Sequence, residues 1–175
     1  MKNEVLIKGS VALIQLASRC YGNLYSLVDR DEVPRILDFE ATWVASYSKD
    51  TKSFYCQAQL KDKSLFGTTC LGLHRFIMNA PLGLEVDHIN HDTLDNRKVN
   101  LRLATRSQNM QNLKGAFSTS KTGIRGVYWE PERQKFRAEL TLGRKKIRIG
   151  RFDSLVDAAQ AISEARHELM PFTRF

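Results

Sequence analysis

Alternation of apolar and polar residues runs through the first sixty positions of the chain. Two apolar runs flank Gly9-Ser10 within residues 4–16, and residues 24–28 form another. Residues 41–47 and 53–60 each place apolar side chains at every second position. This period is typical of half-buried strands, so the pattern predicts a small antiparallel sheet in this part of the chain.

Two short segments carry helix signals instead. Asp31 begins the first, in which acidic residues occupy the first turn and Pro34 lies near the start, where a helix tolerates it. The second covers residues 73–81 and ends at Pro81, because proline cannot continue a helix. A single helix is therefore expected beside the N-terminal sheet, and another just before the middle of the chain.

The last third of the chain repeats the strand pattern and then changes to a helical one. Strands are predicted at residues 125–130, 135–142 and 145–152, separated by short polar turns. Ser154 is a suitable N-cap for a helix that extends to about Met170. This helix is rich in alanine, which allows it to lie close to the sheet.

The two faces of that sheet are expected to differ in character. Alternation turns the apolar side chains toward the helix and the polar ones away from it. Trp129 is expected in the core, on the face opposite to Tyr128. Residues 114–122, before the sheet, are small, polar and rich in turn formers, which is typical of a linker. The expected polar face consists of Arg137, Glu139, Thr141, Lys146 and Arg148.

The middle of the chain contains the residues best suited to chemistry. Asp87 and His88 end the short strand predicted at residues 83–88. An asparagine-rich loop follows, and the alternation at residues 99–103 predicts a returning strand. Successive side chains of a strand point to opposite faces, so His88 is expected to point away from Asp87.

A helix is expected directly after this hairpin. Thr105 and Gln108 fit a capping box, which places Asn109 one turn into the helix and able to face the Asp-His strand. Met110 and Leu113 are expected to form its apolar stripe. The helix would thus bring an amide oxygen toward the acid and the imidazole.

This set of side chains suits the hydrolysis of a phosphodiester. Histidine is the natural general base near neutral pH, and His88 is the candidate. Mg²⁺ binds few protein oxygens and keeps phosphate and water ligands, so Asp87 and the side-chain carbonyl of Asn109 are sufficient protein ligands. A turn-rich hairpin without any chemistry explains the asparagine content, but not these three residues together.

Residues 74–113 resemble the His-Asn-His (HNH) endonucleases, in the version found in phage homing nucleases. The resemblance rests on the ordered motifs D-H-I-N, L-D-N-R, N-L-R-L-A-T and N-x-x-N between residues 87 and 112. It implies a ββα-metal hairpin that cleaves DNA with one divalent cation, Mg²⁺ or alternatively Mn²⁺. It also implies products with 3′-hydroxyl and 5′-phosphate ends.

The resemblance assigns a role to each of four residues. Asp87 and Asn109 match the metal ligands, and His88 matches the general base. Asn100 matches the residue that ties the loop down and orients the base through the main chain. All four are therefore expected to be catalytic residues.

Three nearby residues have interpretations that stay open. For His74 we favour a buried histidine bonded to the main chain. Arg75 either reaches a DNA phosphate or forms an ion pair with Asp87 or Glu85. Arg97 is a weaker phosphate candidate in the loop.

Residues 123–170 resemble the ethylene-response-factor (Apetala-type) DNA-binding domain. The matching motifs are G-V-Y-W, F-R-A-E-L, I-R-I-G-R-F-D and D-A-A-Q-A. In that family the sheet lies in the major groove, so the resemblance implies double-stranded DNA as partner. Arg148 stands where the family has tryptophan, so the target sequence is not implied. The candidate DNA contacts are Arg125, Arg137, Glu139, Lys146 and Arg148.

The charge of the chain supports a polyanionic partner. The net charge is +8, and residues 114–151 contain eleven Lys or Arg against three acids. Each phosphate contacted by a protein releases condensed counterions, so such a concentration of bases suits nucleic acid. The plain alternative is a solvated basic surface.

The composition argues against several other classes of protein. Cys20, Cys56 and Cys70 are widely spaced and no C-x-x-C pair occurs, so neither a disulfide framework nor a structural zinc is expected. No apolar run reaches the ~20 residues of a membrane span, and the first residues lack a signal-peptide pattern. We expect a cytoplasmic protein of a phage-infected or uninfected bacterium, with a monomer favoured over a dimer.

The predicted fold class is α+β. An N-terminal antiparallel sheet and the ββα-metal HNH module occupy residues 1–113 (core 74–113), a linker covers 114–122, and a sheet-plus-helix DNA-binding domain covers 123–175. The predicted function is a metal-dependent DNA endonuclease, in the setting of a phage homing endonuclease that nicks or fully cuts the duplex. Two alternatives stay open: a DNA-binding regulator with a non-catalytic nuclease-like module, and an RNA-directed nuclease.

Overall fold

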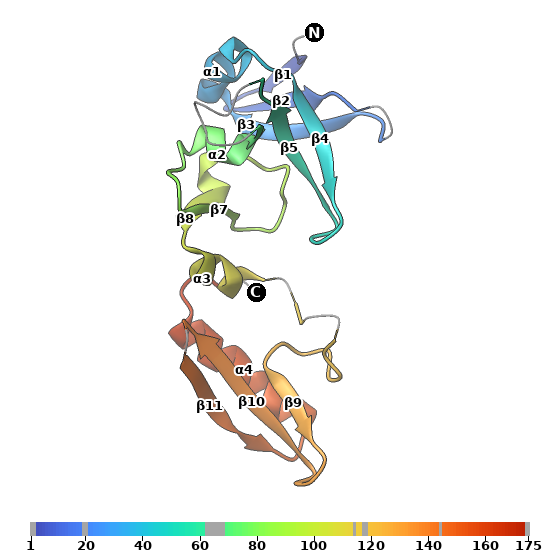
Figure 1. Cartoon of the computed structure of the whole chain (residues 1–175), viewed down its shortest axis with the longest axis vertical. Coiled ribbons are helices and arrows are strands. Elements are labelled where there is room, and N and C mark those ends of the chain that lie inside the picture. Colours follow the sequence, from blue (N-terminus) through green and yellow to red (C-terminus); the bar gives the residue numbers. More distant parts are fainter. Residues whose placement is uncertain are drawn as a thin grey trace. The chain divides into compact units, whose positions relative to one another are not determined.

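The computed structural model describes residues 3–18, 21–61, 69–113, 115–116, 119–143 and 145–173. It is mixed α and β, with several small antiparallel sheets and few helices in the described residues (Figure 1). The chain divides into two compact units, residues 1–104 and residues 105–175, and each is described by itself.

The first unit begins with two antiparallel sheets, which confirm the strands predicted from alternation. Their strand orders are β1-β2-β3 and β4-β5-β6. A parallel bridge between Ala17 and Val44 joins the two sheets. The elements are β1 (Val5–Lys8), β2 (Val11–Leu16), β3 (Leu24–Asp29), η1 (Arg30–Glu32), α1 (Val33–Asp38), β4 (Trp43–Ser48), β5 (Ser53–Gln59) and β6 (Cys70–Gly72).

The core of this unit lies where the inward side chains of both sheets meet α1. Trp43 is 1% exposed, and its indole N–H donates to the carbonyl of Ile36 at 3.3 Å. Its ring stacks on Phe39 and packs at a tilt against Phe76. Cys56 is also 1% exposed, and burial raises the pKa of its thiol, which stays protonated. The alternation in the sequence therefore marks the buried face correctly.

The hairpin predicted to carry the chemistry follows in the same unit. It consists of α2 (Leu73–Ile77), β7 (Glu85–His88), η2 (Lys98–Asn100) and β8 (Leu101–Ala104), with β7 and β8 antiparallel. Its long loop lies against β3, because the N–H of Leu27 donates to Leu94 and the N–H of Asn96 donates to Leu27. The first sheet thereby supports the loop that surrounds the candidate site.

The returning strand starts later than the sequence pattern predicts. Val99 lies in the 3-10 turn η2 and is 76% exposed, and Leu103 is 38% exposed. The turn is closed by the N–H of Asn100, which donates to the carbonyl of Arg97 at 2.9 Å. The apolar periodicity at residues 99–103 was therefore a misleading guide to the start and to one face of β8.

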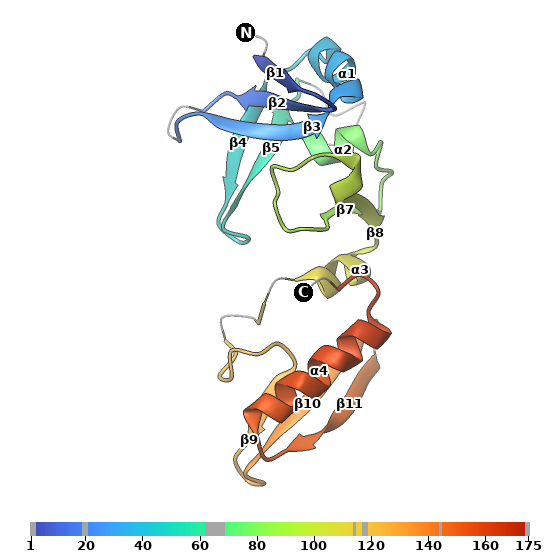
Figure 2. The same cartoon turned by 180° about the vertical axis from the view of Figure 1, so that it is seen from behind.

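The second unit contains the predicted three-stranded sheet with one helix on it. The strand order is β11-β10-β9, and Figure 2 shows α4 lying across one face. Ser154 caps α4 through the N–H of Val156, as expected. The elements are α3 (Arg106–Asn109), η3 (Met110–Asn112), β9 (Val127–Glu130), β10 (Lys135–Leu142), β11 (Lys145–Phe152) and α4 (Leu155–Leu169).

The short helix that carries Asn109 begins with the predicted capping box. The side chain of Thr105 accepts the N–H of Gln108, and the Gln108 side chain accepts the N–H of Thr105. The expected apolar stripe is wrong, because Met110 and Leu113 are 39% and 38% exposed. In the structure residues 105–113 group with the second unit, whereas the sequence-based bounds assign them to the nuclease domain.

A β-bulge interrupts the alternation of β11. Ala138 pairs with Gly150, but the next residue, Glu139, pairs with Arg148, so Ile149 is an extra residue. A bulge of this kind reverses which side chains face each side of a strand beyond it. Residues after position 149 therefore take the faces opposite to those that strict alternation predicts.

Two other features of the described residues differ from or add to the sequence reading. Trp129 is not in the core: it is 39% exposed and packs on the ring of Phe136 at the sheet. None of the described helices combines the length and the hydrophobicity that a membrane crossing requires.

Candidate active site

The β7–β8 hairpin holds Asp87 and His88 side by side at the end of β7. Asp87 pairs with Arg102 and His88 pairs with Leu101 in the register of the hairpin. Adjacent residues in a strand point to opposite faces, so each of the two side chains has its own surroundings. Each is 6% exposed, and a polar group buried to this extent needs hydrogen-bond partners within the protein.

Arg102 holds the carboxylate of Asp87. Its Nε and Nη2 both donate to Oδ2 of Asp87, at 2.8 and 2.7 Å. Two charge-assisted bonds from one guanidinium fix the orientation of the carboxylate. The sequence reading missed Arg102, because its pairing with Asp87 on the neighbouring strand follows only once the register of β7 and β8 is known.

Asn96 holds the imidazole of His88. The Asn96 side-chain nitrogen donates to Ser26 at 2.8 Å and to the carbonyl of Leu94 at 3.3 Å, which directs its oxygen the other way. That oxygen lies 3.2 Å from Nε2 of His88. Since an amide oxygen only accepts, neutral His88 carries its proton on Nε2 and its basic lone pair on Nδ1. Asn96 thus bonds the imidazole directly, whereas the expected role of Asn100, which orients the base through the main chain, stays a prediction.

Burial favours the neutral form of His88. It lowers the pKa of the imidazole below the usual 6.5, and the hydrogen bond that His88 donates to Asn96 and the charge of Asp87 offset only part of this effect. A histidine in this state is unprotonated near neutral pH, as a general base must be.

His74 lies against His88 with its ring edge-on, 5.1 Å between centroids. Burial, together with the neighbouring His88 and Arg75, lowers the pKa of His74 to about 3. Its Nδ1 is covered and has no hydrogen-bond partner in the described part of the chain. Ring contacts with His88 and Tyr55 surround the imidazole, and this nitrogen makes no bond to the main chain of the described residues.

The loop between the strands is closed by its own polar side chains. Asn100 accepts the N–H of Asn90 at 2.9 Å and donates to the carbonyl of Asp95 at 2.8 Å, which ties the loop as expected for this residue. Asp95 in turn accepts two bonds from Arg97, both at 2.7 Å. Arg97 keeps a side chain that is 32% exposed, and its contact with phosphate stays a prediction.

The Arg75 side chain bonds to the main chain of its own unit. Its guanidinium donates to three main-chain carbonyls, of Leu84, Ala80 and Pro81, at 2.7 to 3.3 Å. These bonds shape the turn between α2 and β7. They correspond to neither of the two interpretations drawn from the sequence, and its DNA contact stays a prediction.

Asn109 ends α3, in the second unit. Its N–H donates to the carbonyl of Thr105 at 2.9 Å, and its side chain is half-buried. Asp87 belongs to the first unit. Among the described residues no group of three or more His, Cys, Asp or Glu could hold a metal. A carboxylate and an amide oxygen nevertheless fit a hard cation that keeps water and phosphate ligands.

The polar face of the C-terminal sheet is an ion-pair network rather than a plain cluster of bases. Arg137 lies 3.2 Å from Glu130 and 3.4 Å from Glu139. Its guanidinium also stacks over the ring of Tyr128, 5.3 Å from the centroid. Arg137 is thereby held in one orientation.

The third strand adds three bases to this face. Lys146 has a 76% exposed side chain, 3.9 Å from Glu139, and Arg148 is exposed opposite the same glutamate. Arg151 bonds to Glu130 at 2.6 Å. The sequence reading missed Arg151 because the bulge at Ile149 moves it to the polar face. The sequence did contain one sign of the bulge. The apolar residue Phe152 is out of phase with the apolar position Ile147.

Arg125 bonds to the main chain instead of to these acids. It donates to the carbonyls of Met110, Gln111 and Leu113, within the second unit. These bonds occupy much of its guanidinium, although the sequence reading made it a DNA contact.

The sequence is similar to one protein family and to two viral proteins. The HNH endonuclease family matches residues 74–111. Protein 3.8 of Escherichia phage T7 is 33% identical over 96 residues, which cover 54% of this chain and 78% of that protein. An uncharacterized HNH endonuclease of Acanthamoeba polyphaga mimivirus is 43% identical over 61 residues, 31% of this chain and 32% of that protein. No solved structure matches.

Residues 74–111 thus form an HNH endonuclease domain. The chain belongs to the HNH endonuclease family, with relatives in viruses of bacteria and of amoebae.

Proposed function

We propose that this protein is a metal-dependent DNA endonuclease in which His88 is the general base. The observation that carries the proposal is the pair at the end of β7: a carboxylate oriented by Arg102 beside an imidazole oriented by Asn96. Partners of this kind hold a polar group in one orientation before substrate arrives, which catalysis requires.

The reaction is the hydrolysis of one phosphodiester. Nδ1 of His88 takes a proton from water while the water oxygen bonds to phosphorus, and the bond from phosphorus to the 3′ oxygen breaks. The 3′ oxygen acquires a proton, which leaves 3′-hydroxyl and 5′-phosphate ends. Asp87 and the side-chain carbonyl of Asn109 would hold Mg²⁺ or Mn²⁺. When bound, the cation supplies charge that neutralises the phosphate and the departing oxygen.

The second unit supplies affinity for duplex DNA in this proposal. Its polar sheet face carries Arg137, Lys146, Arg148 and Arg151, with the acids Glu130 and Glu139 between them. Such a face, opposite the α4 side, resembles that of the ethylene-response-factor domains and suits a groove. A monomeric phage homing endonuclease, acting in the cytoplasm of the host bacterium, is the setting we propose.

A plasmid assay tests the enzyme. Supercoiled plasmid is incubated with Mg²⁺ or with EDTA, and nicks are then treated with DNA ligase, which reseals only 3′-hydroxyl and 5′-phosphate ends. We expect Mg²⁺-dependent, resealable nicks, and a rate reduced by about 10²- to 10⁴-fold in His88→Ala, the range for a lost general base. DNA affinity in EDTA is expected to stay unchanged.

The same assay separates the alternatives. If wild type and His88→Ala give equal, background nicking while both bind DNA, the protein is a DNA-binding regulator. Preferential cleavage of structured RNA over duplex DNA would instead identify an RNA-directed nuclease.

A further inference from the structure

We propose that Arg125 is a positioning residue. It anchors the turn directly after Asn109, residues 110–113, to the sheet of the second unit. The inference rests on the proposed function, because it concerns a ligand of the proposed cation. It replaces a DNA contact, the role that the sequence suggests for Arg125, with a role inside the protein.

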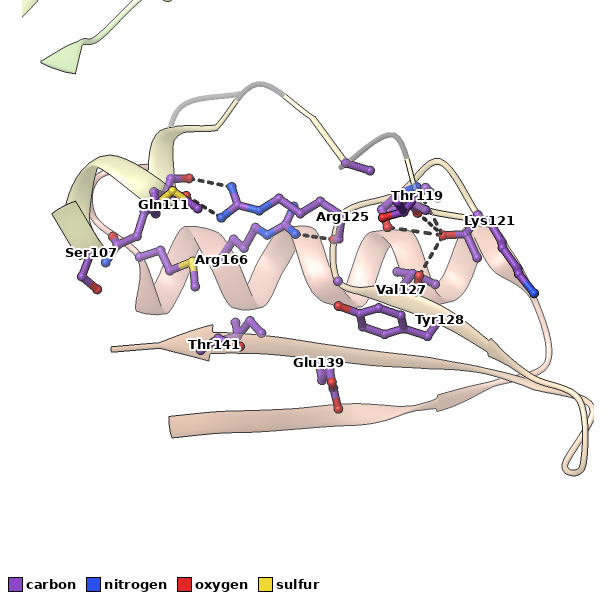
Figure 3. Close-up of a pocket in the computed structure, with 18 of the residues that line it drawn as sticks. Ser107, Gln111, Thr119, Lys121, Arg125, Val127, Tyr128, Glu139, Thr141 and Arg166 are labelled. Carbon is purple, nitrogen blue, oxygen red and sulfur yellow. Dashed lines mark hydrogen bonds between the residues drawn. The ribbon is translucent and has the colours of Figure 1, made fainter. Parts of the chain in front are cut away.

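Arg125 caps the end of the Asn109 helix. Its Nη1 donates to the carbonyls of Gln111 and Leu113 at 3.1 and 3.4 Å, and its Nη2 donates to that of Met110. Figure 3 shows the Arg125 side chain extending toward Gln111. The last carbonyls of a helix lack partners within it and carry partial negative charge. One guanidinium thus satisfies three acceptors in the residues directly after Asn109.

The main chain at Arg125 is itself held in place by α4 and β10. Its carbonyl accepts a bond from Arg166 of α4 (Figure 3). The next residue, Gly126, has φ +82°, and a Cβ there would lie 2.6 Å from the carbonyl oxygen of Glu139 and 3.2 Å from the Arg166 guanidinium. Only glycine therefore allows this close approach of the chain to β10. The anchor is connected to both the helix and the sheet of the second unit.

The C-terminal end of the chain holds the same turn from another side. Thr173 donates its hydroxyl to the carbonyl of Gln111 at 3.2 Å, and the N–H of Phe172 donates to the Gln111 side chain at 3.4 Å. Gln111 is 7% exposed. The turn after Asn109 is thus bonded at two places to the sheet unit.

Polar bonds, rather than apolar packing, fix this turn. Its large apolar side chains, Met110 and Leu113, remain more than a third exposed. Arg125 and Arg166 also line a cavity of about 870 Å³ beside it (Figure 3). Removal of Arg125 should therefore release the turn without opening the sheet core.

Three variants test the anchor. Arg125→Ala removes all three bonds, Arg125→Lys keeps the charge but lacks the planar fork, and Arg133→Ala removes one positive charge from the exposed β9–β10 turn as a control. We measure amide hydrogen exchange at residues 110–113, DNA affinity in EDTA at several salt concentrations, and nicking as a function of Mg²⁺ concentration.

Both Arg125 variants should speed exchange at residues 110–113 and leave DNA affinity like that of Arg133→Ala. At sub-saturating Mg²⁺ they should nick roughly tenfold more slowly, the usual effect of losing a residue that orients a metal ligand, and recover at higher Mg²⁺. Unchanged exchange overturns the anchor. So does a loss of DNA affinity that is restored in Arg125→Lys, because charge alone would then be the contribution.

The exchange measurement does not depend on catalysis. If the wild type never nicks DNA, the proposed function fails, while faster exchange in Arg125→Ala still supports the anchor. If the wild type nicks and exchange is unaffected, only the anchor fails.

Discussion

At the scale of single residues, the candidate site is defined by what holds each side chain. Asp87 and His88 are neighbours in sequence, yet one is oriented by a guanidinium and the other by an amide. Ser26 sets the orientation of the Asn96 amide. It therefore determines, through a chain of two hydrogen bonds, which nitrogen of His88 carries the proton. A buried polar group with a complete set of partners has one low-energy state.

Asn96→Ala should remove the preference of His88 for the Nε2 proton. We expect nicking to fall by about 10- to 100-fold, as for other residues that orient a catalytic group. Nitrogen-15 chemical shifts of the imidazole at neutral pH report the protonated nitrogen directly. Thr93→Val, which removes a bond from the same loop to Phe54, is the control. A wild-type His88 protonated on Nδ1 would contradict the assignment.

His74 should make the first unit sensitive to acid. Its pKa is about 3 in the folded protein and near 6.5 when unfolded, so between these values the unfolded chain binds a proton that the folded one does not. Stability is therefore full above pH 6.5 and declines as the pH falls toward 3. His74→Phe should retain about 1–2 kcal/mol more of its stability at pH 5 than wild type does.

Urea unfolding at pH 7.5 and pH 5 measures this difference, followed by the fluorescence of Trp43 with Trp129→Phe present in every variant. His167→Gln, on the exposed side of α4, is the matched control and should lose as much stability as wild type. Equal acid losses in wild type and His74→Phe would show that another group is responsible.

At the scale of elements, the C-terminal sheet presents a polar face with defined members. The bulge in β11 brings Arg151 beside Arg148, on the face that also carries Arg137. Arg137 and Arg151 already bond to Glu130, whereas Arg148 is exposed. Exposed bases are the ones whose binding to phosphate releases counterions without first breaking an ion pair.

Arg148→Ala should weaken DNA binding and flatten its salt dependence. The slope of log affinity against log salt is expected to fall by about 0.9, the contribution of one phosphate contact on duplex DNA. Fluorescence anisotropy over a range of salt concentrations measures it, with Lys8→Ala in β1 as a variant of equal charge. An unchanged slope would show that this sheet face does not meet DNA.

Alternation predicts these elements well where nothing interrupts it. The inward face of β10 and the capping box at Thr105 follow from local chemistry, and so does the adjacency of Asp87 and His88. The bulge at Ile149 and the late start of β8 do not, because both depend on how a neighbouring strand pairs.

The residues that bond to Asp87 and His88 could not be predicted from local sequence either. Arg102 and Asn96 reach Asp87 and His88 only once register and loop path are fixed. Arg125 has a basic side chain at a position expected to meet DNA, and only the fold shows that helix carbonyls surround it. Residue type indicated the chemistry here, and tertiary contacts decided which residue performs it.

At the scale of the whole molecule, the division between the two units falls at Ala104 and Thr105. This lies before Asn109, whereas the linker predicted from composition lies after it, at residues 114–122. The basic excess of the chain also belongs to the second unit, since residues 114–151 carry eleven bases and three acids. The unit that is proposed to bind DNA therefore also carries one proposed metal ligand.

Insertion of a Gly-Ser-Gly-Ser segment distinguishes these two boundaries. Between Ala104 and Thr105 it should slow nicking at low Mg²⁺ by roughly tenfold, because a flexible link lowers the effective concentration of Asn109. Between Gly115 and Ala116 it should change the rate by only about twofold, the modest cost of a longer loop. Initial rates across a Mg²⁺ series give both values, and a larger effect at Gly115 would favour the composition-based boundary.

The covered thiol of Cys56 allows the opening of the first unit to be timed. Since the sulfur is buried and protonated, iodoacetamide can react with it only in molecules whose β4–β5–β6 sheet has come apart. Peptide mass spectrometry distinguishes its alkylation from that of half-buried Cys70. The ratio of its labelling rate to that of an unprotected thiol gives the opening equilibrium of this unit, and no residue of the second unit enters the measurement.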